Sequence, residues 1–322
     1  MHAPEANPKL VFQAYGSRSE HAINSISRGG LNLALVHAAA RHENVSLHFD
    51  RRCVDVDVAS ATAVFVREDG SEERVAADLV IGADGAFSAV RGALQKTDRF
   101  EYSQNYLEAG YKELHIPAVA GGGGPHGGFA LDPNALHIWP RGSAMMIALP
   151  NPDKSFTCTL FWPFEMLTGL TTREQVDRFF QAHYPDAVPL MPTLVDDYLA
   201  NPVGSLVTVR CWPWARHSER GTVAVLGDAA HAIVPFYGQG MNAAFEDVAR
   251  AGGVSGGEGR RHSRGDGRVP AAPQAERRRD RANGAGELRR DARQGGEQIV
   301  SVEEEVRARG AGGCAGHVSV AL

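Results

Sequence analysis

The sequence is organised around the stretch VAVLGDAAH at residues 223–231 and the string GQGMN at 238–242. The apolar run before Gly227 and Asp228 predicts a buried parallel strand that ends in a turn. In α/β folds, an aspartate at such a strand end faces the crevice where ligands bind, and it can accept hydrogen bonds from sugar-like hydroxyl groups. The spacing over 241–248 predicts a helix whose N-terminus suits a negatively charged ring system. A strand, a loop and a helix with ordinary caps are the structural alternative.

A second strand signal ends in the same way. The string DLVIGADG at residues 78–85 is an apolar run that closes on Gly-Ala-Asp-Gly, and Ser88 and Arg91 follow it. Asp84 at its end either binds ligand hydroxyl groups or caps the next helix. Two strands that both end in Gly and Asp favour a ligand site over two unrelated caps.

Together these strings resemble the flavin motifs of the class A FAD-dependent aromatic hydroxylases, and IVPFYGQGMNAAFED at 233–247 resembles the kynurenine 3-monooxygenases among them. The resemblance implies FAD as cofactor and NADPH and O₂ as co-substrates. It implies that the oxygen chemistry takes place on the flavin, so it assigns no catalytic side chain and no metal. The cofactor contacts that it implies are Arg28, Cys53, Asp84, Asp228, Gly240, Met241 and Asn242. For Cys53, the role of a small buried hydrophobe is an equal alternative.

The resemblance also implies a substrate and its pocket. The reaction would convert L-kynurenine to 3-hydroxy-L-kynurenine in tryptophan catabolism, inside an apolar pocket built on an antiparallel sheet. The candidate pocket residues are Tyr15, Met145, Ile147, Leu149, Phe161, Pro235 and Phe236. For the sheet residues, plain core packing is the alternative, and His137 and Trp139 read as packing residues. Two other functions remain open: hydroxylation of another aromatic such as a phenol or benzoate, and a non-catalytic remnant that binds no flavin.

The expected fold class is α/β (α+β), with an incomplete Rossmann-like FAD-binding domain and an antiparallel sheet for the substrate. The expected divisions are a partial FAD-binding domain at 1–97, the substrate domain at 98–210, a return to the FAD-binding domain at 211–248, and a tail at 249–322. Periodicity predicts helices over 30–42 and 171–183 and a hairpin turn at 69–70. It predicts strands over 45–49, 53–58, 63–66, 136–140, 144–150 and 156–162.

The sequence departs from the family pattern in two places. The strand, Gly-x-Gly-x-x-Gly turn and helix that hold the pyrophosphate of FAD are not found near residue 1, and the Gly run at 121–124 lies in the wrong context. From residue 249 onward Phe, Tyr, Trp and Lys are absent and Arg is abundant. Such a composition predicts a disordered or frameshifted tail, or a basic tail that binds anionic surfaces. With both departures, we expect the chain as written to have little hydroxylase activity.

Composition excludes several other classes. The 322 residues carry a net charge of −5, which is too mild to indicate nucleic-acid binding. The 4 cysteines show neither metal-ligand spacing nor a disulfide framework, which favours a reducing, cytoplasmic location. No apolar run is long enough to predict a transmembrane helix, and the N-terminal residues do not resemble a signal peptide.

Overall fold

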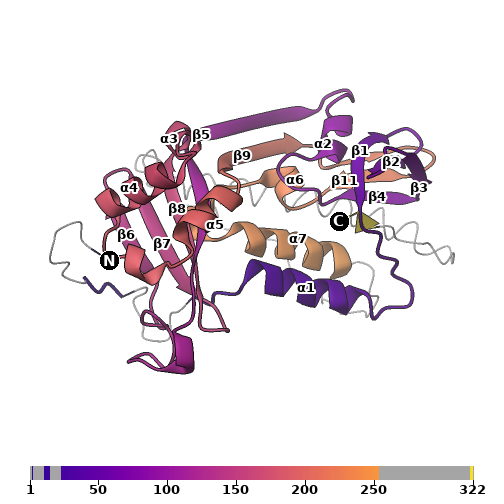
Figure 1. The fold of residues 1–322 in the computed structure, drawn as a ribbon. Coiled ribbons are helices and arrows are strands. Elements are labelled where there is room, and N and C mark those ends of the chain that lie inside the picture. Colours follow the sequence, from indigo (N-terminus) through magenta and orange to yellow (C-terminus); the bar gives the residue numbers. More distant parts are fainter. Residues whose placement is uncertain (1, 3–10, 15–22, 254–319, 322) are drawn as a thin grey trace, which may run out of the picture. The chain divides into compact units, whose positions relative to one another are not determined.

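The computed structural model describes residues 2, 11–14, 23–253 and 320–321 (Figure 1). The chain divides into two compact units. Unit 1 comprises residues 1–43 and 105–207, and unit 2 comprises residues 44–104 and 208–322. Two strands, β5 (Glu101–Ile116) and β9 (Gly204–Trp212), belong partly to each unit. Among the described helices, none has the length and hydropathy that crossing a membrane requires.

Unit 1 is built on a five-stranded sheet with the strand order β6-β7-β8-β5-β9. Its first three strands are β6 (His137–Arg141), β7 (Ala144–Pro150) and β8 (Phe156–Pro163). They pair antiparallel, β6 with β7 and β7 with β8, so the predicted antiparallel sheet is confirmed. The sequence pattern does not predict β5, because the first half of that strand is largely exposed and lacks an alternating apolar face.

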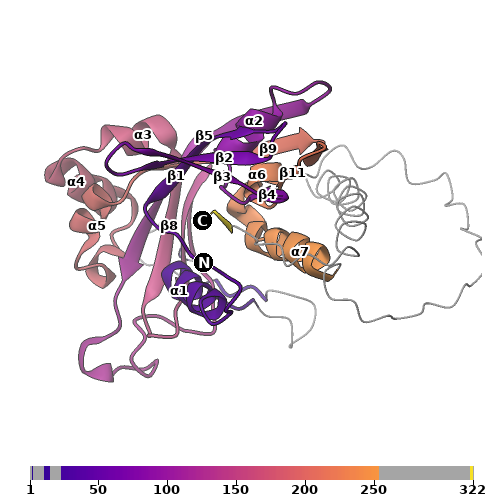
Figure 2. The same cartoon turned by 90° about the vertical axis from the view of Figure 1, so that its right-hand side faces the viewer.

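Helices cover one face of this sheet, as Figure 2 shows for α3 (Phe164–Gly169), α4 (Arg173–His183) and α5 (Leu194–Ala200). The predicted helix over 171–183 is confirmed as α4. It begins at a capping box in which the Thr172 hydroxyl accepts from the Gln175 amide while the Gln175 side chain accepts from the Thr172 amide. The core between helices and sheet includes Trp139, Met146, Leu160, Val176, Phe180, Tyr184 and Tyr198. Short 3₁₀ helices η1 (Ala120–Gly122) and η2 (Val188–Leu190) complete the unit.

The opposite face of the sheet carries the predicted pocket residues of β7 and β8. Successive residues of a strand point to opposite faces, and β7 buries Ala144, Met146 and Ala148 toward the helices. Met145, Ile147 and Leu149 therefore point the other way, and the register pairs Met145 with Phe161 on the same face. Helix α1 (Arg28–Ala39), predicted over 30–42, begins near this face, since Arg28 contacts Glu113, the register partner of Thr159.

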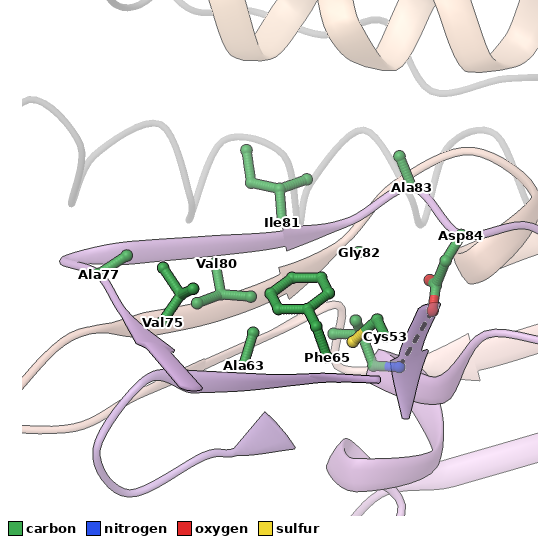
Figure 3. Close-up of a pocket in the computed structure, with 11 residues that line it drawn as sticks. Cys53, Ala63, Phe65, Val75, Ala77, Val80, Ile81, Gly82, Ala83 and Asp84 are labelled. Carbon is green, nitrogen blue, oxygen red and sulfur yellow. Dashed lines mark hydrogen bonds between the residues drawn. The ribbon is translucent and has the colours of Figure 1, made fainter. Parts of the chain in front are cut away.

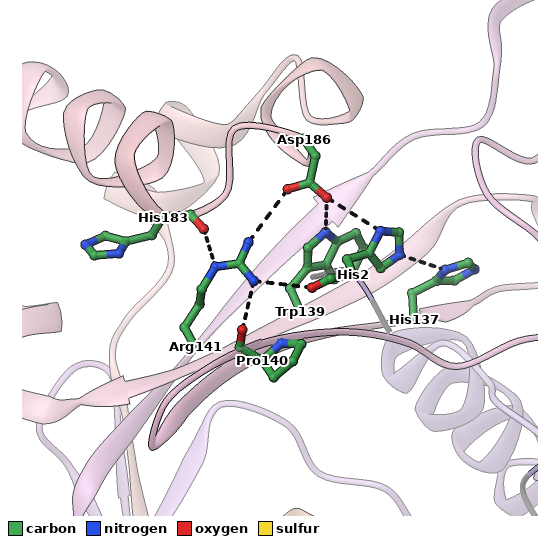
Figure 4. Close-up of polar contacts among 7 residues, drawn as sticks. All are labelled: His2, His137, Trp139, Pro140, Arg141, His183 and Asp186. Atoms are coloured by element: carbon green, nitrogen blue, oxygen red, sulfur yellow. Dashed lines mark hydrogen bonds and ion pairs between the residues drawn. The ribbon is translucent and has the colours of Figure 1, made fainter. Parts of the chain in front are cut away.

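The edge of the sheet at β6 holds a buried polar cluster (Figure 4). The indole of Trp139 donates to Asp186 at 2.8 Å, and the His2 ring stacks on that indole with centroids 4.0 Å apart. His2 also contacts His137 at 3.2 Å, and its amide donates to the Ile138 carbonyl. Trp139 is fully buried and His137 nearly so, which confirms the prediction that both are packing residues.

Unit 2 contains a sheet with the strand order β10-β11-β4-β12, and β11 (Thr222–Val225) runs parallel to its neighbour β4 (Leu79–Gly82). The outer strands are β10 (Ala215–His217), antiparallel to β11, and β12 (Val320–Ala321), parallel to β4. All four residues of β11 are buried, as the apolar run predicts for a central strand. The helices of the unit are α2 (Ala89–Leu94), α6 (Asp228–His231), the 3₁₀ helix η3 (Pro235–Tyr237) and α7 (Gly240–Gly253).

A second sheet of unit 2 has the order β1-β2-β3, with β1 (Arg51–Asp57), β2 (Thr62–Arg67) and β3 (Glu72–Ala76). The predicted strands 53–58 and 63–66 match β1 and β2, and the predicted turn at 69–70 joins β2 to β3. The strand predicted over 45–49 is wrong. That segment pairs with no strand of the described fold.

The C-terminal prediction is tested only at its beginning. The helix predicted over 241–248 is confirmed as α7, and α7 continues to Gly253 although the change of composition begins at 249. The rest of the predicted tail lies outside the described residues apart from β12.

Candidate functional site

The two Gly-Asp motifs leave the same edge of one sheet. Because β4 and β11 are parallel neighbours with Gly82 in register with Val225, their carboxyl ends lie side by side. The pairing continues one residue further, where the Leu226 amide donates to the Gly82 carbonyl at 3.0 Å. Asp84 and Asp228 follow these ends within a few residues, as the two strand signals predict. In open α/β sheets, the crevice outside the carboxyl ends of the strands is where ligands bind.

Asp84 uses only one of its two carboxylate oxygens within the described fold. Its Oδ2 accepts from the backbone amides of Ala89 at 2.8 Å and Val90 at 3.2 Å, so the capping role is present. Its Oδ1 is buried and has no hydrogen-bond partner among the described residues. A buried acceptor without a partner costs free energy, and a ligand hydroxyl group would remove that cost.

Asp84 stands at the end of a small apolar pocket between β4 and the sheet of β1, β2 and β3 (Figure 3). The lining residues are Cys53, Ala63, Phe65, Val75, Ala77, Val80, Ile81, Gly82, Ala83, Asp84 and Val90. Burial, and then the charge of Asp84, raise the pKa of the Cys53 thiol to about 11. The structure thus brings Cys53 and Asp84 to one pocket, with the thiol in its neutral form at neutral pH.

Asp228 faces the beginning of α7. Gly227 has a positive φ of 57°, and a Cβ there would also lie 3.1 Å from the Cβ of Ala244, so this turn favours glycine. A Cβ on Gly240 would lie 4.0 Å from Oδ1 of Asp228. The exposed Asp228 carboxylate and the first residues of α7, including the exposed Met241 and Asn242, therefore border one space. Backbone N–H groups in the first turn of a helix have no intrahelical acceptor, so this end of α7 suits an electron-rich partner.

Arg91 follows the first of the two motifs in the sequence and has no predicted role, but the structure shows that it links the two motifs. Its guanidinium donates to the Ala229 carbonyl in α6 at 2.8 Å and to the Ala86 carbonyl after Asp84 at 2.7 Å. Arg91 is 3% exposed and lies over the Tyr102 ring at 5.1 Å. The available signal was an arginine between apolar neighbours in the short segment AVRGAL, since a buried arginine needs fixed partners.

The remaining predicted residues lie in several places. Arg28 is largely exposed in unit 1, and Glu113 is 3.7 Å from it. Of the sheet residues, Phe161 is buried while Met145, Ile147 and Leu149 are half-buried. Pro235 and Phe236 belong to unit 2, in η3, and both are exposed. Tyr15 lies outside the described residues.

Comparison with known sequences gives this arrangement a family. The family described as "FAD binding domain" matches residues 18–131 and 136–253. The kynurenine 3-monooxygenase of Dictyostelium discoideum is 53% identical over 241 residues, which are 74% of this chain and 50% of that protein. The enzyme of the same name from Sus scrofa is 43% identical over 235 residues, 72% of this chain and 48% of that protein. The chain spans about half the length of the curated relatives that it matches.

Solved structures agree at the level of the fold. The tetrameric 2-methyl-3-hydroxypyridine-5-carboxylic acid oxygenase superposes with a TM-score of 0.53 and 23% identity, over 71% of this chain and 57% of the other. The expected mixed α/β fold, with an FAD-binding domain and an antiparallel sheet, is therefore confirmed, as is the resemblance to the kynurenine 3-monooxygenases. Because the family match covers most of its residues, the chain belongs to the FAD binding domain family.

Proposed function

We propose that this chain is the flavin-holding part of an FAD-dependent, NADPH-using monooxygenase that hydroxylates L-kynurenine to 3-hydroxy-L-kynurenine. The observation that carries the proposal is the meeting of two Gly-Asp strand ends at one sheet edge, with one aspartate facing the first turn of α7. The names of the relatives support the reaction, and the half-length match makes it a statement about the longer protein that they represent.

The residues present fit a flavin with a polyhydroxylated side chain. Oδ1 of Asp84 has no hydrogen-bond partner within the described fold, and the Asp228 carboxylate is exposed. Hydroxyl groups are the donors that both acceptors suit. Gly240 leaves room beside Asp228 for a ligand to approach the backbone closely. The first turn of α7 offers backbone N–H groups to the electron-rich end of the ring.

When bound, reduced FAD supplies the activation of O₂ that hydroxylation of an aromatic ring needs. In the proposal, Asp84 and Asp228 hold the cofactor's hydroxyl groups, and the first turn of α7 holds the ring through its N–H groups. Arg28, Cys53, Met241 and Asn242 complete the proposed cofactor contacts. The division of the chain into FAD-binding segments at 1–97 and 211–248, with a substrate domain at 98–210 between them, is part of the proposal.

The proposed substrate surface is the helix-free face of the sheet of unit 1, where Met145, Ile147, Leu149 and Phe161 share one side. Apolar, half-buried side chains suit an aromatic ring and exclude water from it. Pro235, Phe236 and Tyr15 are proposed as further contacts. The free thiols of Cys53, Cys158 and Cys211 support a reducing, cytoplasmic location.

The test is a titration of the purified chain with FAD, followed by quenching of flavin fluorescence, with Asp228→Ala alongside. We expect saturable binding that is weaker in Asp228→Ala. If the wild-type chain binds no FAD, the alternative of a non-catalytic remnant holds. Adding L-kynurenine, benzoate or a phenol to the flavin complex then tests the substrate class, because only the ligand that enters the pocket perturbs the flavin spectrum.

A further inference from the structure

One carboxylate oxygen in α7 holds both ends of the turn that carries Asp228. Oδ2 of Asp247 accepts from the backbone amide of Gly227 at 3.0 Å and from Nε2 of His231 at 2.6 Å. Gly227 and His231 flank the segment that begins with Asp228, so both ends of this segment are joined to the same atom. Asp247 is 6% exposed, and charge-assisted hydrogen bonds at buried sites are among the stronger polar contacts.

Helix α7 has little else to hold it within the described fold. Among its described side chains Asp247 is the only buried one, while Met241, Phe245 and Val248 are 47%, 43% and 58% exposed. A helix normally docks through an apolar face, and this one presents its large apolar side chains to solvent. The contacts of Asp247 are therefore a main anchor of α7 to its own unit.

The anchor determines which groups face each other at the site. The Gly227 turn and the first turn of α7 approach closely, with Asp228 beside Gly240. If the turn and the helix separate, the Asp228 carboxylate and the N–H groups of α7 no longer border the same space. On its other side the His231 ring packs against the Trp214 ring, with centroids 5.0 Å apart.

We propose that His231 and Asp247 form a positioning clamp, in which the imidazole and the carboxylate hold α7 against the Gly227–His231 turn and so fix the spacing between Asp228 and the start of α7. This inference rests on the proposed flavin function for its consequence, but the clamp itself is a property of the protein without ligand. Its function is to preorganise the site, since groups held in place bind a ligand without paying an ordering cost at that moment.

The charges around His231 determine how the clamp responds to pH. Burial by itself lowers the pKa of His231, but the hydrogen bond and charge of Asp247, with a smaller contribution from Asp228, outweigh burial and raise it above 6.5. A raised histidine pKa means that the folded state favours the protonated form. The part of the clamp's contribution that depends on the histidine charge is therefore complete below pH 6.5 and is lost as the pH rises through the raised pKa, while the bond from the Gly227 amide stays.

The first test needs no flavin. NMR titration of the His231 ring should give a pKa above 6.5 in the wild-type chain and a lower one in Asp247→Asn, where burial remains and the charge is gone. Hydrogen exchange at the Gly227 amide and along α7 should be faster in Asp247→Ala by tenfold or more. Glu246→Gln is the matched control, because it removes the neighbouring carboxylate of the same helix, which pairs with Arg250 in α7. The His231 pKa and the exchange rates of Glu246→Gln should equal those of the wild type.

The second test measures FAD affinity against pH. We expect the FAD affinity of the wild type and of Glu246→Gln to fall as the pH rises through the His231 pKa. His231→Gln keeps a hydrogen-bond donor but does not titrate, so its FAD affinity should change less with pH. Asp247→Ala should bind FAD about 10-fold to 10²-fold more weakly, the factor for one charge-assisted hydrogen bond. If the wild-type chain shows the expected His231 pKa and hydrogen exchange but binds no FAD, the flavin function is refuted and the clamp is not. A wild-type His231 pKa below 6.5, or unchanged exchange in Asp247→Ala, would refute the clamp.

Discussion

Replacing Asp84 separates the two roles that its carboxylate combines. Oδ2 caps α2 through the amides of Ala89 and Val90, while Oδ1 is buried without a partner among the described residues. Asp84→Asn keeps an oxygen for the cap and replaces the free oxygen by an amide that cannot accept a hydroxyl proton. Asp84→Ala removes both.

The two substitutions therefore differ in their expected effects. A hydrogen bond to a charged group contributes about 1.5–3 kcal/mol. Since about 1.4 kcal/mol is tenfold in affinity, Asp84→Asn should weaken FAD binding by about 10-fold to 10²-fold. Its free energy of unfolding without FAD should stay within about 0.5 kcal/mol of the wild type. Asp84→Ala should lose affinity to a similar degree and also lose about 0.5–2 kcal/mol of stability with the cap.

Fluorescence titration with FAD and urea unfolding without FAD measure the two effects separately. Asp78→Asn is the matched control, because Asp78 is exposed just before β4, at the end of the strand away from Asp84. It should leave both quantities unchanged. Wild-type affinity in Asp84→Asn would show that Oδ1 does not face the cofactor, and the reasoning from its missing partner would fail.

Four other outcomes are expected. Gly82→Ala should lower the free energy of unfolding, measured by urea unfolding, by about 1–3 kcal/mol, because a Cβ there would lie 2.6 Å from the Cβ of Val90. An unchanged free energy would mean that α2 can shift at no cost. Trp139→Phe should cost about 1.5–3 kcal/mol in the same assay through the lost bond to Asp186, and a neutral result would show that this bond adds no stability. Burial lowers the pKa of His2 to about 4, so the free energy of unfolding should fall as the pH drops from 6.5 toward 4, and His2→Gln should reduce that slope. Supplied with excess FAD, NADPH and L-kynurenine, the chain as written should form little 3-hydroxykynurenine by chromatography, and turnover like that of a full-length relative would contradict this expectation.

Local patterns account for much of the fold. The apolar runs before Gly82 and Gly227 mark β4 and β11, because a strand buried on both faces must be apolar along its length. A continuous apolar run marks β7, alternation marks the first half of β8, and the Thr172 cap marks α4. Strand β5 is not predicted because its exposed half carries no apolar period. Residues 45–49 alternate apolar and polar residues but pair with no strand of the described fold, so alternation alone does not supply a ladder partner.

The sequence by itself determined the chemistry available at the two strand ends, since Gly-Asp after an apolar run is a feature of adjacent residues. Only the tertiary structure decided that β4 and β11 are neighbours, that Oδ1 of Asp84 is buried without a described partner, and that Asp247 holds Gly227 and His231. Arg91 and Asp247 look like ordinary helix residues in the sequence. Their partners lie far along the chain, and such contacts are set by the packing of whole elements, which no local period of the sequence encodes.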